Sequence, residues 1–183
     1  MAEPLRRLFT ASEYQTMISA GILEGDRVEL IEGEILQMPA MGSRHVSGVI
    51  RATRTLAALH DRADISVQNA VHLDDLSEPQ PDLAVLRRRS DVYADSLPTP
   101  QDILLLIEVA DTSAGYDRKV KIKLYAHNGV PEAWLISLGS STLEVYRDPS
   151  PQGYREVKIL RRGERLSPLA FPDLVIDVDS LLG

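Results

Sequence analysis

Two carboxylates lie at the ends of apolar segments, where a buried charge needs a partner. Glu108 is near the carboxyl end of the run ILLLIEVA (103–110), and Asp82 opens DLAVL (82–86) directly after Pro81. Carboxylates are rarely buried unless they are paired or bind a metal. If the two segments are neighbouring strands, the acids converge at one sheet edge and repel each other unless a cation lies between them. Hard oxygen ligands of this kind suit Mg²⁺, Mn²⁺ or Ca²⁺.

A lysine on the following helix is the predicted partner of this pair. In the helix expected over 117–128, positions two apart are rotated by about 200° and positions four apart share a face. Lys119 and Lys123 therefore form one polar stripe, and Lys121 points toward the protein interior. A buried ammonium needs an acid, so we expect it to meet the two carboxylates. In such a site a metal polarises a phosphate and activates water, while lysine positions or deprotonates that water or stabilises the phosphorane charge.

Further candidate residues also have a purely structural explanation. His45 opens a predicted helix, where it could bind phosphate, ligate a metal or act as a base, or only contact the start of the helix. Glu29 and Glu34 flank a predicted hairpin turn, and either could reach the metal, although alternation on an exposed hairpin explains both. We take His45 as catalytic and Glu34 as a metal ligand. Four arginines are either solvated or contact the phosphate backbone of a nucleic acid: Arg44, Arg51, Arg87 and Arg88.

The elements that position these residues are a sheet and the helices beside it. Alternating or apolar runs predict a hairpin over 28–39 and strands over 65–73, 82–86, 103–110, 132–138, 142–147 and 154–160. Helical spacing predicts helices over 11–20, 45–60 and 117–128, the last with Asp117 as its N-cap. We therefore predict an α+β fold in which a mixed, twisted β-sheet is flanked by helices, in a single domain over 1–183.

Composition narrows the class of protein. The chain has 183 residues, no cysteine and a formal net charge of −7. Without cysteine there are no disulfides or thiolate metal sites. No segment resembles a signal sequence or approaches the roughly 18 apolar residues that span a bilayer, so we expect a cytoplasmic protein with no membrane partner. The acidic balance argues against a protein that coats nucleic acid, but it does not exclude a nuclease with a carboxylate site and a small basic patch.

Four segments resemble, in their order, the Uma-type restriction endonuclease family of the PD-(D/E)XK superfamily: PDLAVL, IEVADTS, YDRKVKIKLYA and NGVPEAWLISL. The likeness also includes VELIEGEI, His45 and the closing LSPLAFPDLVI, and it covers nearly the whole chain. It implies a restriction-endonuclease-like fold with Asp82 as the PD acid and Glu108 as the second acid. The usual lysine position, two residues after that acid, holds Ala110, and Lys121 matches a lysine displaced onto the next helix.

The resemblance implies a DNA endonuclease that hydrolyses phosphodiester bonds with Mg²⁺ or Mn²⁺ at Asp82 and Glu108. Its partners would be DNA and a divalent metal. Two other functions stay open, a non-catalytic binding or scaffold protein that keeps the nuclease fold, and a phosphoesterase acting on small molecules. The acidic balance and Ala110 favour the first of these. By analogy with related nucleases, a homodimer is expected, with the apolar, hairpin-rich C-terminal half as its interface.

Overall fold

A six-stranded mixed β-sheet is the centre of the computed structural model, which describes residues 6–111 and 113–183. The strand order is β3-β4-β5-β6-β7-β8. Strands β5 and β6 run parallel, and all other neighbours in this sheet are antiparallel. This confirms the predicted α+β class with a mixed sheet. The strand bounds are β3 Asp64–Val67, β4 Leu83–Leu86, β5 Ile103–Ala110, β6 Glu132–Ser137, β7 Thr142–Ser150 and β8 Gly153–Leu160.

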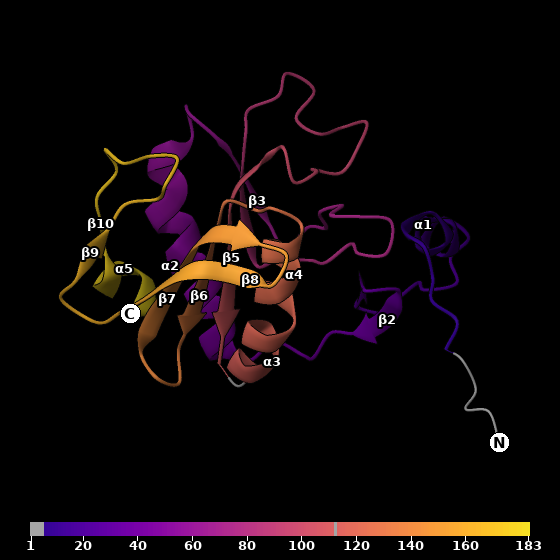
Figure 1. Ribbon diagram of the computed structural model, residues 1–183, viewed down its shortest axis with the longest axis horizontal. Helices are drawn as coiled ribbons and strands as arrows, with labels where there is room; N and C mark the ends of the chain where they lie inside the picture. The colour runs from indigo at the N-terminus through magenta and orange to yellow at the C-terminus, as the bar shows by residue number, and fades with distance from the viewer. Residues whose placement is uncertain (1–5, 112) are drawn as a thin grey trace.

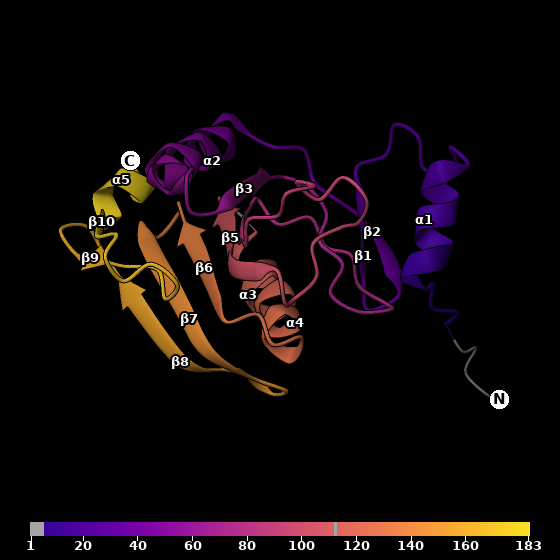
Figure 2. The same cartoon turned by 90° about the horizontal axis from the view of Figure 1, so that it is seen from above.

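Helices cover both faces of this sheet. One layer contains α2 (Ser43–Leu56), the 3₁₀ turn η1 (Ala57–Leu59) and α5 (Val178–Leu182). The other layer contains α3 (Ala114–Lys119) and α4 (Lys121–His127). Figure 1 and Figure 2 show the sheet between the two layers. The central strands are therefore buried on both sides, as their continuous apolar character predicts.

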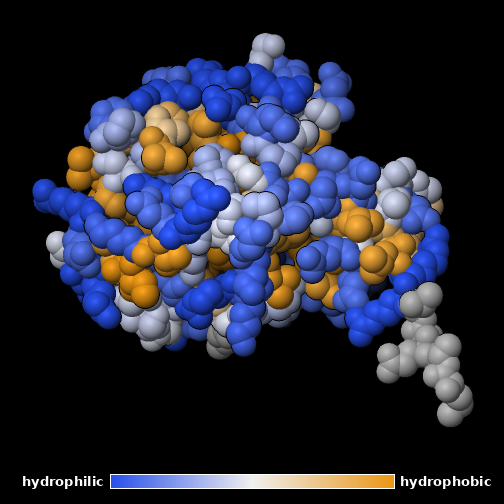
Figure 3. Space-filling model, viewed as in Figure 1, coloured by the Kyte–Doolittle hydropathy of each residue, from blue (hydrophilic) through white to orange (hydrophobic). Residues whose placement is uncertain are grey.

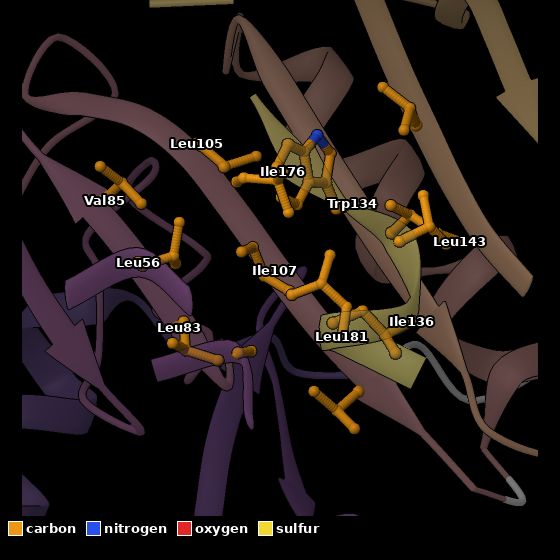
Figure 4. Packing of buried hydrophobic residues seen from close by; sticks show 14 of the residues in the cluster. Leu56, Leu83, Val85, Leu105, Ile107, Trp134, Ile136, Leu143, Ile176 and Leu181 are labelled. Carbon is orange, nitrogen blue, oxygen red and sulfur yellow. The ribbon is translucent and has the colours of Figure 1, made fainter. Parts of the chain in front are cut away.

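Alternate residues of the central strands form the core on the α2 side. Leu105 and Ile107 of β5 pack there with Trp134 and Ile136 of β6, as Figure 4 shows. Full burial of such a side chain contributes roughly 1.5–3 kcal/mol. Because successive side chains point to opposite faces of a strand, Glu108 faces the other layer, in which α4 lies.

A helix and a hairpin near the N-terminus form a separate small layer, which Figure 2 shows beside the sheet. Tyr14 of the helix packs on Leu30 of the hairpin. The hairpin turn consists of Glu32 and Gly33, whose φ angles of 48° and 81° are left-handed, as a two-residue hairpin turn requires. The predicted helix and hairpin are both confirmed. Their bounds are α1 Ala11–Ser19, β1 Val28–Ile31 and β2 Glu34–Gln37.

Two predicted elements and one predicted cap differ from those observed. The strand predicted over 65–73 ends at Val67, because Gln68 has a left-handed φ of 55° and leaves the sheet. The helix predicted over 117–128 already begins at Ala114 and is interrupted at Val120. Asp117 is therefore not an N-cap. It lies within α3, where its carboxylate accepts a hydrogen bond from the hydroxyl of Ser113 (2.7 Å).

The closing segment adds a small sheet that the sequence pattern does not predict. Its strands β9 (Arg165–Leu166) and β10 (Ile176–Asp177) are antiparallel and lead into α5. Within residues 6–111 and 113–183, no helix has the length and apolar character to cross a bilayer. Residues 1–5, which open the segment examined for a signal sequence, and Thr112 of the family-like segment IEVADTS lie outside the described residues.

Candidate active site

The register of β4 and β5 brings the two predicted acids together. The strands are antiparallel and Leu83 pairs with Ile107, so the same register places Asp82 beside Glu108. The main-chain N–H of Val109 donates to Asp82 Oδ2 over 2.9 Å, which joins the first acid to the strand that carries the second. Asp82 and Glu108 are 8% and 4% exposed. Two carboxylates at this depth need cations or protons as partners.

Lys121 at the start of α4 supplies a cation. Its Nζ lies 3.4 Å from Glu108 Oε1 and 3.0 Å from Glu29 Oε2. Lys121 is 5% exposed, whereas Lys119 and Lys123 are exposed. The facing predicted from helical spacing is therefore confirmed. An amine from a helix reaches acids that come from two different strands.

Burial controls the protonation of Glu108. It raises the pKa of Glu108 to about 8, an effect that Lys121 opposes and Asp82 reinforces. The hydroxyl of Tyr125 donates a hydrogen bond to Glu108 Oε1. Burial lowers the pKa of Lys121, but Glu108 and Glu29 more than offset this, so the pKa is raised and the amine keeps its proton. Because Glu29 is the closer acid, the ammonium stays paired when Glu108 is protonated.

His45 and Gln68 hold the first acid from the side of α2. His45 Nε2–H donates to Asp82 Oδ1 over 2.9 Å, and Gln68 Nε2 donates to the same oxygen over 3.1 Å. The hydrogen bond with Asp82 raises the pKa of His45, although burial lowers it. Helix α2 approaches the sheet closely at Gly48, where a Cβ would lie 2.6 Å from Val109 Cγ1. The glycine thus allows α2 to bring His45 to Asp82, at the start of β4.

A cavity of about 560 Å³ opens beside these residues. Its wall includes the carboxylates of Glu29, Asp82 and Asp117, the amine of Lys121 and the imidazole of His45. Burial raises the pKa of Asp117, and the hydrogen bond from Ser113 opposes this. The cavity lies between the β1–β2 hairpin, the start of α2, Asp82 and the helices α3 and α4, so residues far apart in the chain must fold together to form it.

The donors fit a magnesium-type ion. Asp82 and Glu108 are adjacent carboxylates with hard oxygen atoms, although Glu108 lies behind the cavity wall rather than in it. Burial is the main cause of the raised pKa of Glu108, and the neighbouring carboxylate of Asp82 adds to it. Among the residues that the structure describes, no three His, Cys, Asp or Glu side chains are spaced to hold an ion. Mg²⁺ retains several waters and binds through one or two carboxylates plus substrate phosphate, so two acids suffice for it.

Glu29, rather than the predicted ligand Glu34, is the hairpin acid beside the site. Glu34 pairs with Arg6 and does not line the cavity. Both acids face the same side of the hairpin, because Glu34 pairs with Ile31, two residues after Glu29. Glu34 lies at the turn, whereas Glu29 lies at the open end, from which the chain continues to α2. The alternation of residues in the sequence predicts only which side of the hairpin a residue faces. It therefore could not distinguish Glu29 from Glu34, which face the same side.

Two of the predicted nucleic-acid-binding residues lie on α2. Arg44 Nη1 is 3.1 Å from Asp111 Oδ1, and Asp111 lines the cavity. Arg51 donates to the main-chain oxygens of Leu181 and Leu182, both over 3.2 Å. Arg44 is therefore next to the candidate active site, and Arg51 lies further along the helix against α5.

The other two, Arg87 and Arg88, lie at the wrong end of the sheet for this site. They follow β4, whereas Asp82 precedes it, so a strand of about 13 Å separates them from the acids. Their guanidinium groups donate to the carbonyl oxygens of Gln101 and Asp61. This position argues against contact with a nucleic acid bound at the cavity.

Tyr125 and Gln68 contact the two acids but are not among the predicted site residues. Tyr125 follows Lys121 by four positions, so the helical spacing that places the lysine beside the acids also places the tyrosine there. Gln68 reaches Asp82 because the chain turns out of β3 at that residue. No sequence pattern predicts the turn at Gln68.

Known proteins share this fold. A family model described as "Uma2: Putative restriction endonuclease" matches residues 11–179. No curated protein matches the chain. Among solved structures, the chain is similar to one described as a putative nuclease belonging to DUF820 from Anabaena variabilis. The two are 20% identical, with a TM-score of 0.70 over 85% of this chain and 89% of that chain. At this identity the similarity is one of fold.

Proposed function

Because the chain belongs to the Uma2 family, described as "Putative restriction endonuclease", we propose that it is a metal-dependent endonuclease that hydrolyses phosphodiester bonds of DNA. The observation that carries this proposal is the position of Lys121. Its amine lies at the wall of the cavity that Asp82 also lines and within ion-pair distance of Glu108. The absence of cysteine suits a reducing compartment, and the cytoplasm is the location we propose.

The proposed mechanism assigns a different task to each side chain. Asp82 and Glu108 would hold the divalent ion, Mg²⁺ or Mn²⁺. When bound, such an ion polarises the scissile phosphate and lowers the pKa of its water ligand. Lys121 keeps its proton because its pKa is raised, so it orients the attacking water and stabilises phosphorane charge rather than acting as a base. His45 holds Asp82 in place through the hydrogen bond to Oδ1.

Cleavage of supercoiled plasmid and branched DNA tests the proposal, with Mg²⁺ or Mn²⁺ in one arm and EDTA in the other. We expect Asp82→Asn and Lys121→Met each to reduce the cleavage rate by at least about 100-fold. Lys123→Met is the matched control, because it removes the same charge from the exposed face of the same helix. It should cleave like the wild type.

Two outcomes would end the assignment. One is equal cleavage by the wild type and Asp82→Asn. The other is equal loss of activity in Lys123→Met and Lys121→Met. Circular dichroism of each variant separates a loss of catalysis from a loss of folding.

A non-catalytic protein with the same fold is the second candidate. Both oxygens of Asp82 already accept hydrogen bonds from protein donors, and Glu108 lies outside the cavity wall. Because the oxygen atoms of Asp82 already have hydrogen-bond partners within the protein, the cluster is also compatible with a protein that binds no metal. Calorimetric titration with Mn²⁺ at neutral pH distinguishes the two candidates, because absence of binding together with absence of cleavage favours the non-catalytic one.

We also propose that the chain forms a homodimer through the edge strand β8. Among the described residues, β8 pairs only with β7, and Val157 and Ile159 on it are about half exposed. Figure 3 shows apolar side chains over the region of β7 and β8. Exposed edge strands readily pair with another chain. An antiparallel pair centred on Val157 places Glu156 of each copy opposite Lys158 of the other, whereas centring on either charged residue opposes like charges.

A further inference from the structure

A second hollow, of about 450 Å³, lies beyond the Arg44–Asp111 ion pair from the candidate active site. Asp111 lines the first cavity and Arg44 lines the second. We call the second one the arginine hollow. Among the described residues, its wall contains no Asp or Glu side chain. The polar side chains that line it are Ser43, Arg44, Ser47, Arg51, Ser141 and Arg162.

The three arginines of this hollow come from separate parts of the chain. Arg44 and Arg51 lie on α2, and Arg162 follows β8; both Figure 1 and Figure 2 place α5 and the end of the chain beside α2. Arg51 Nη1 donates to Ser47 Oγ over 2.7 Å, and Arg162 Nη1 is 3.3 Å from Asp179 Oδ1. A guanidinium carries five N–H groups, more than these contacts use. The arginines are therefore held in place and can still donate to an anion.

We propose that the arginine hollow binds the phosphate backbone of DNA next to the phosphodiester that is cleaved. This inference rests on the proposed function. The chain carries a net charge of −7, and in the wall of its first cavity the acids outnumber Arg27 and Lys121. A positively charged contact outside that cavity therefore favours the binding of a polyanion. Arginine binds phosphate through paired N–H donors, and serine hydroxyls add further contacts. Helix α2 also begins at the hollow, and no side chain caps it at Gly42, so its N-terminus adds positive potential.

A structural role for the same arginines makes a different prediction. Arg51 and Arg162 also contact the segment around α5, and they could serve only to fix that helix. In that case their substitution lowers stability but leaves the salt dependence of DNA binding unchanged. Binding to phosphates releases counterions, so each lost contact reduces the slope of log K against log salt by about 0.9.

Fluorescence anisotropy of a labelled DNA duplex between about 50 and 200 mM NaCl tests the proposal. Divalent metal is removed with EDTA, so binding is measured without cleavage. We expect Arg44→Gln and Arg162→Gln each to weaken binding and to lower the salt slope by about 0.9. Arg165→Gln is the matched control, because Arg165 is an exposed, ion-paired arginine outside the hollow. It should keep the wild-type slope.

A charge added to the hollow gives a test that unfolding cannot imitate. An acid in the first turn of a helix is stabilising, so Ser43→Asp should melt no lower than the wild type and yet bind DNA more weakly. Unchanged slopes in Arg44→Gln and Arg162→Gln, or an equal loss in Arg165→Gln, overturn the proposal. A third result would also overturn the proposal: inorganic phosphate raises the melting temperature of the protein but does not compete with DNA for binding. The hollow would then bind only a free anion. Asp82-dependent cleavage decides the nuclease assignment separately, so either proposal can fail while the other holds.

Discussion

Glu108 links pH, folding and metal binding in one side chain. Burial raises its pKa from the usual 4.5 to about 8. Between these two values the folded, metal-free protein binds more protons at this group than the unfolded chain does. Its contribution to stability is therefore fully present below pH 4.5 and is lost as the pH rises toward 8. Each pH unit in this window corresponds to about 1.4 kcal/mol in the free energy of unfolding.

We therefore predict that Glu108→Gln stabilises the metal-free protein at about pH 8 and changes it little at about pH 5. Glutamine needs no proton to be neutral, and its carbonyl oxygen can still accept from Tyr125. Urea unfolding in EDTA measures the difference between the two proteins, which isolates this group from other titrating residues. Mg²⁺ added at the higher pH should stabilise the wild type more than the variant. The free energies of unfolding of the wild type and Glu108→Gln could instead differ by the same amount at every pH. That result would show that burial does not keep the proton on Glu108.

A site residue could be predicted where a local sequence pattern determines its position, and could not where its position depends on contacts between distant segments. The positions of Asp82 and Glu108 at the ends of apolar segments predict the pair of acids, and helical spacing predicts the facing of Lys121, because these are local regularities. Glu29 could not be preferred over Glu34, since the choice depends on which end of the hairpin meets α2. Contact of Arg87 and Arg88 with nucleic acid stays a prediction, although the direction of β4 puts these two arginines at the opposite end of that strand from Asp82.

At the scale of elements, the distance between α2 and β5 depends on one glycine. A Cβ on Gly48 would lie 2.6 Å from Val109 Cγ1, in the core, and the main-chain N–H of Val109 also donates to Asp82. We predict that Gly48→Ala lowers the free energy of unfolding by about 1–3 kcal/mol, because overpacking outweighs the better helix propensity of alanine. Urea unfolding measures this change.

Gly115→Ala is the matched control, since a Cβ on this glycine of α3 would meet nothing within 4 Å. It should be neutral or slightly stabilising. Combining Gly48→Ala with Val109→Ala should recover part of the loss, because the two sites share one contact. If Gly48→Ala were as stable as Gly115→Ala, the close approach at this glycine would not determine where α2 lies.

The elements themselves were predictable where local pattern decided them. The apolar run of β5 and the alternation around Glu32 and Gly33 gave the central strand and the hairpin. The early end of β3 at Gln68 and the break at Val120 were not predictable, because neither residue type interrupts a strand or helix by itself. Strands β9 and β10 have two residues each. Two residues are too few to show an alternating pattern in the sequence, so these strands are recognised only from their pairing in the structure.

At the scale of the whole molecule, the proposed dimer joins two sheets into one through β8. We predict that Lys158→Glu dissociates it, because acids from the two copies then lie opposite each other. The double variant Glu156→Lys with Lys158→Glu restores opposite charges across the axis and should dimerise again. Sedimentation velocity at low salt measures the mass of each species.

Lys119→Glu makes the same charge change on an exposed face of α3 and controls for net charge, so it should leave the dimer intact. A monomeric wild type would contradict the interface. A double variant that is as monomeric as Lys158→Glu would contradict the register. Either result leaves the nuclease assignment untouched, since the candidate active site is built from one chain.

The amine of the candidate site is carried by a helix and its acids by strands. Ala110, two residues after Glu108, is fully buried, so the sheet there contributes packing where a lysine would otherwise be expected. A motif search that requires acid and amine on the same strand passes over such a chain, whereas a search by spatial arrangement finds the three groups together. The family model, which matches residues 11–179 as a whole, does not depend on that two-residue spacing.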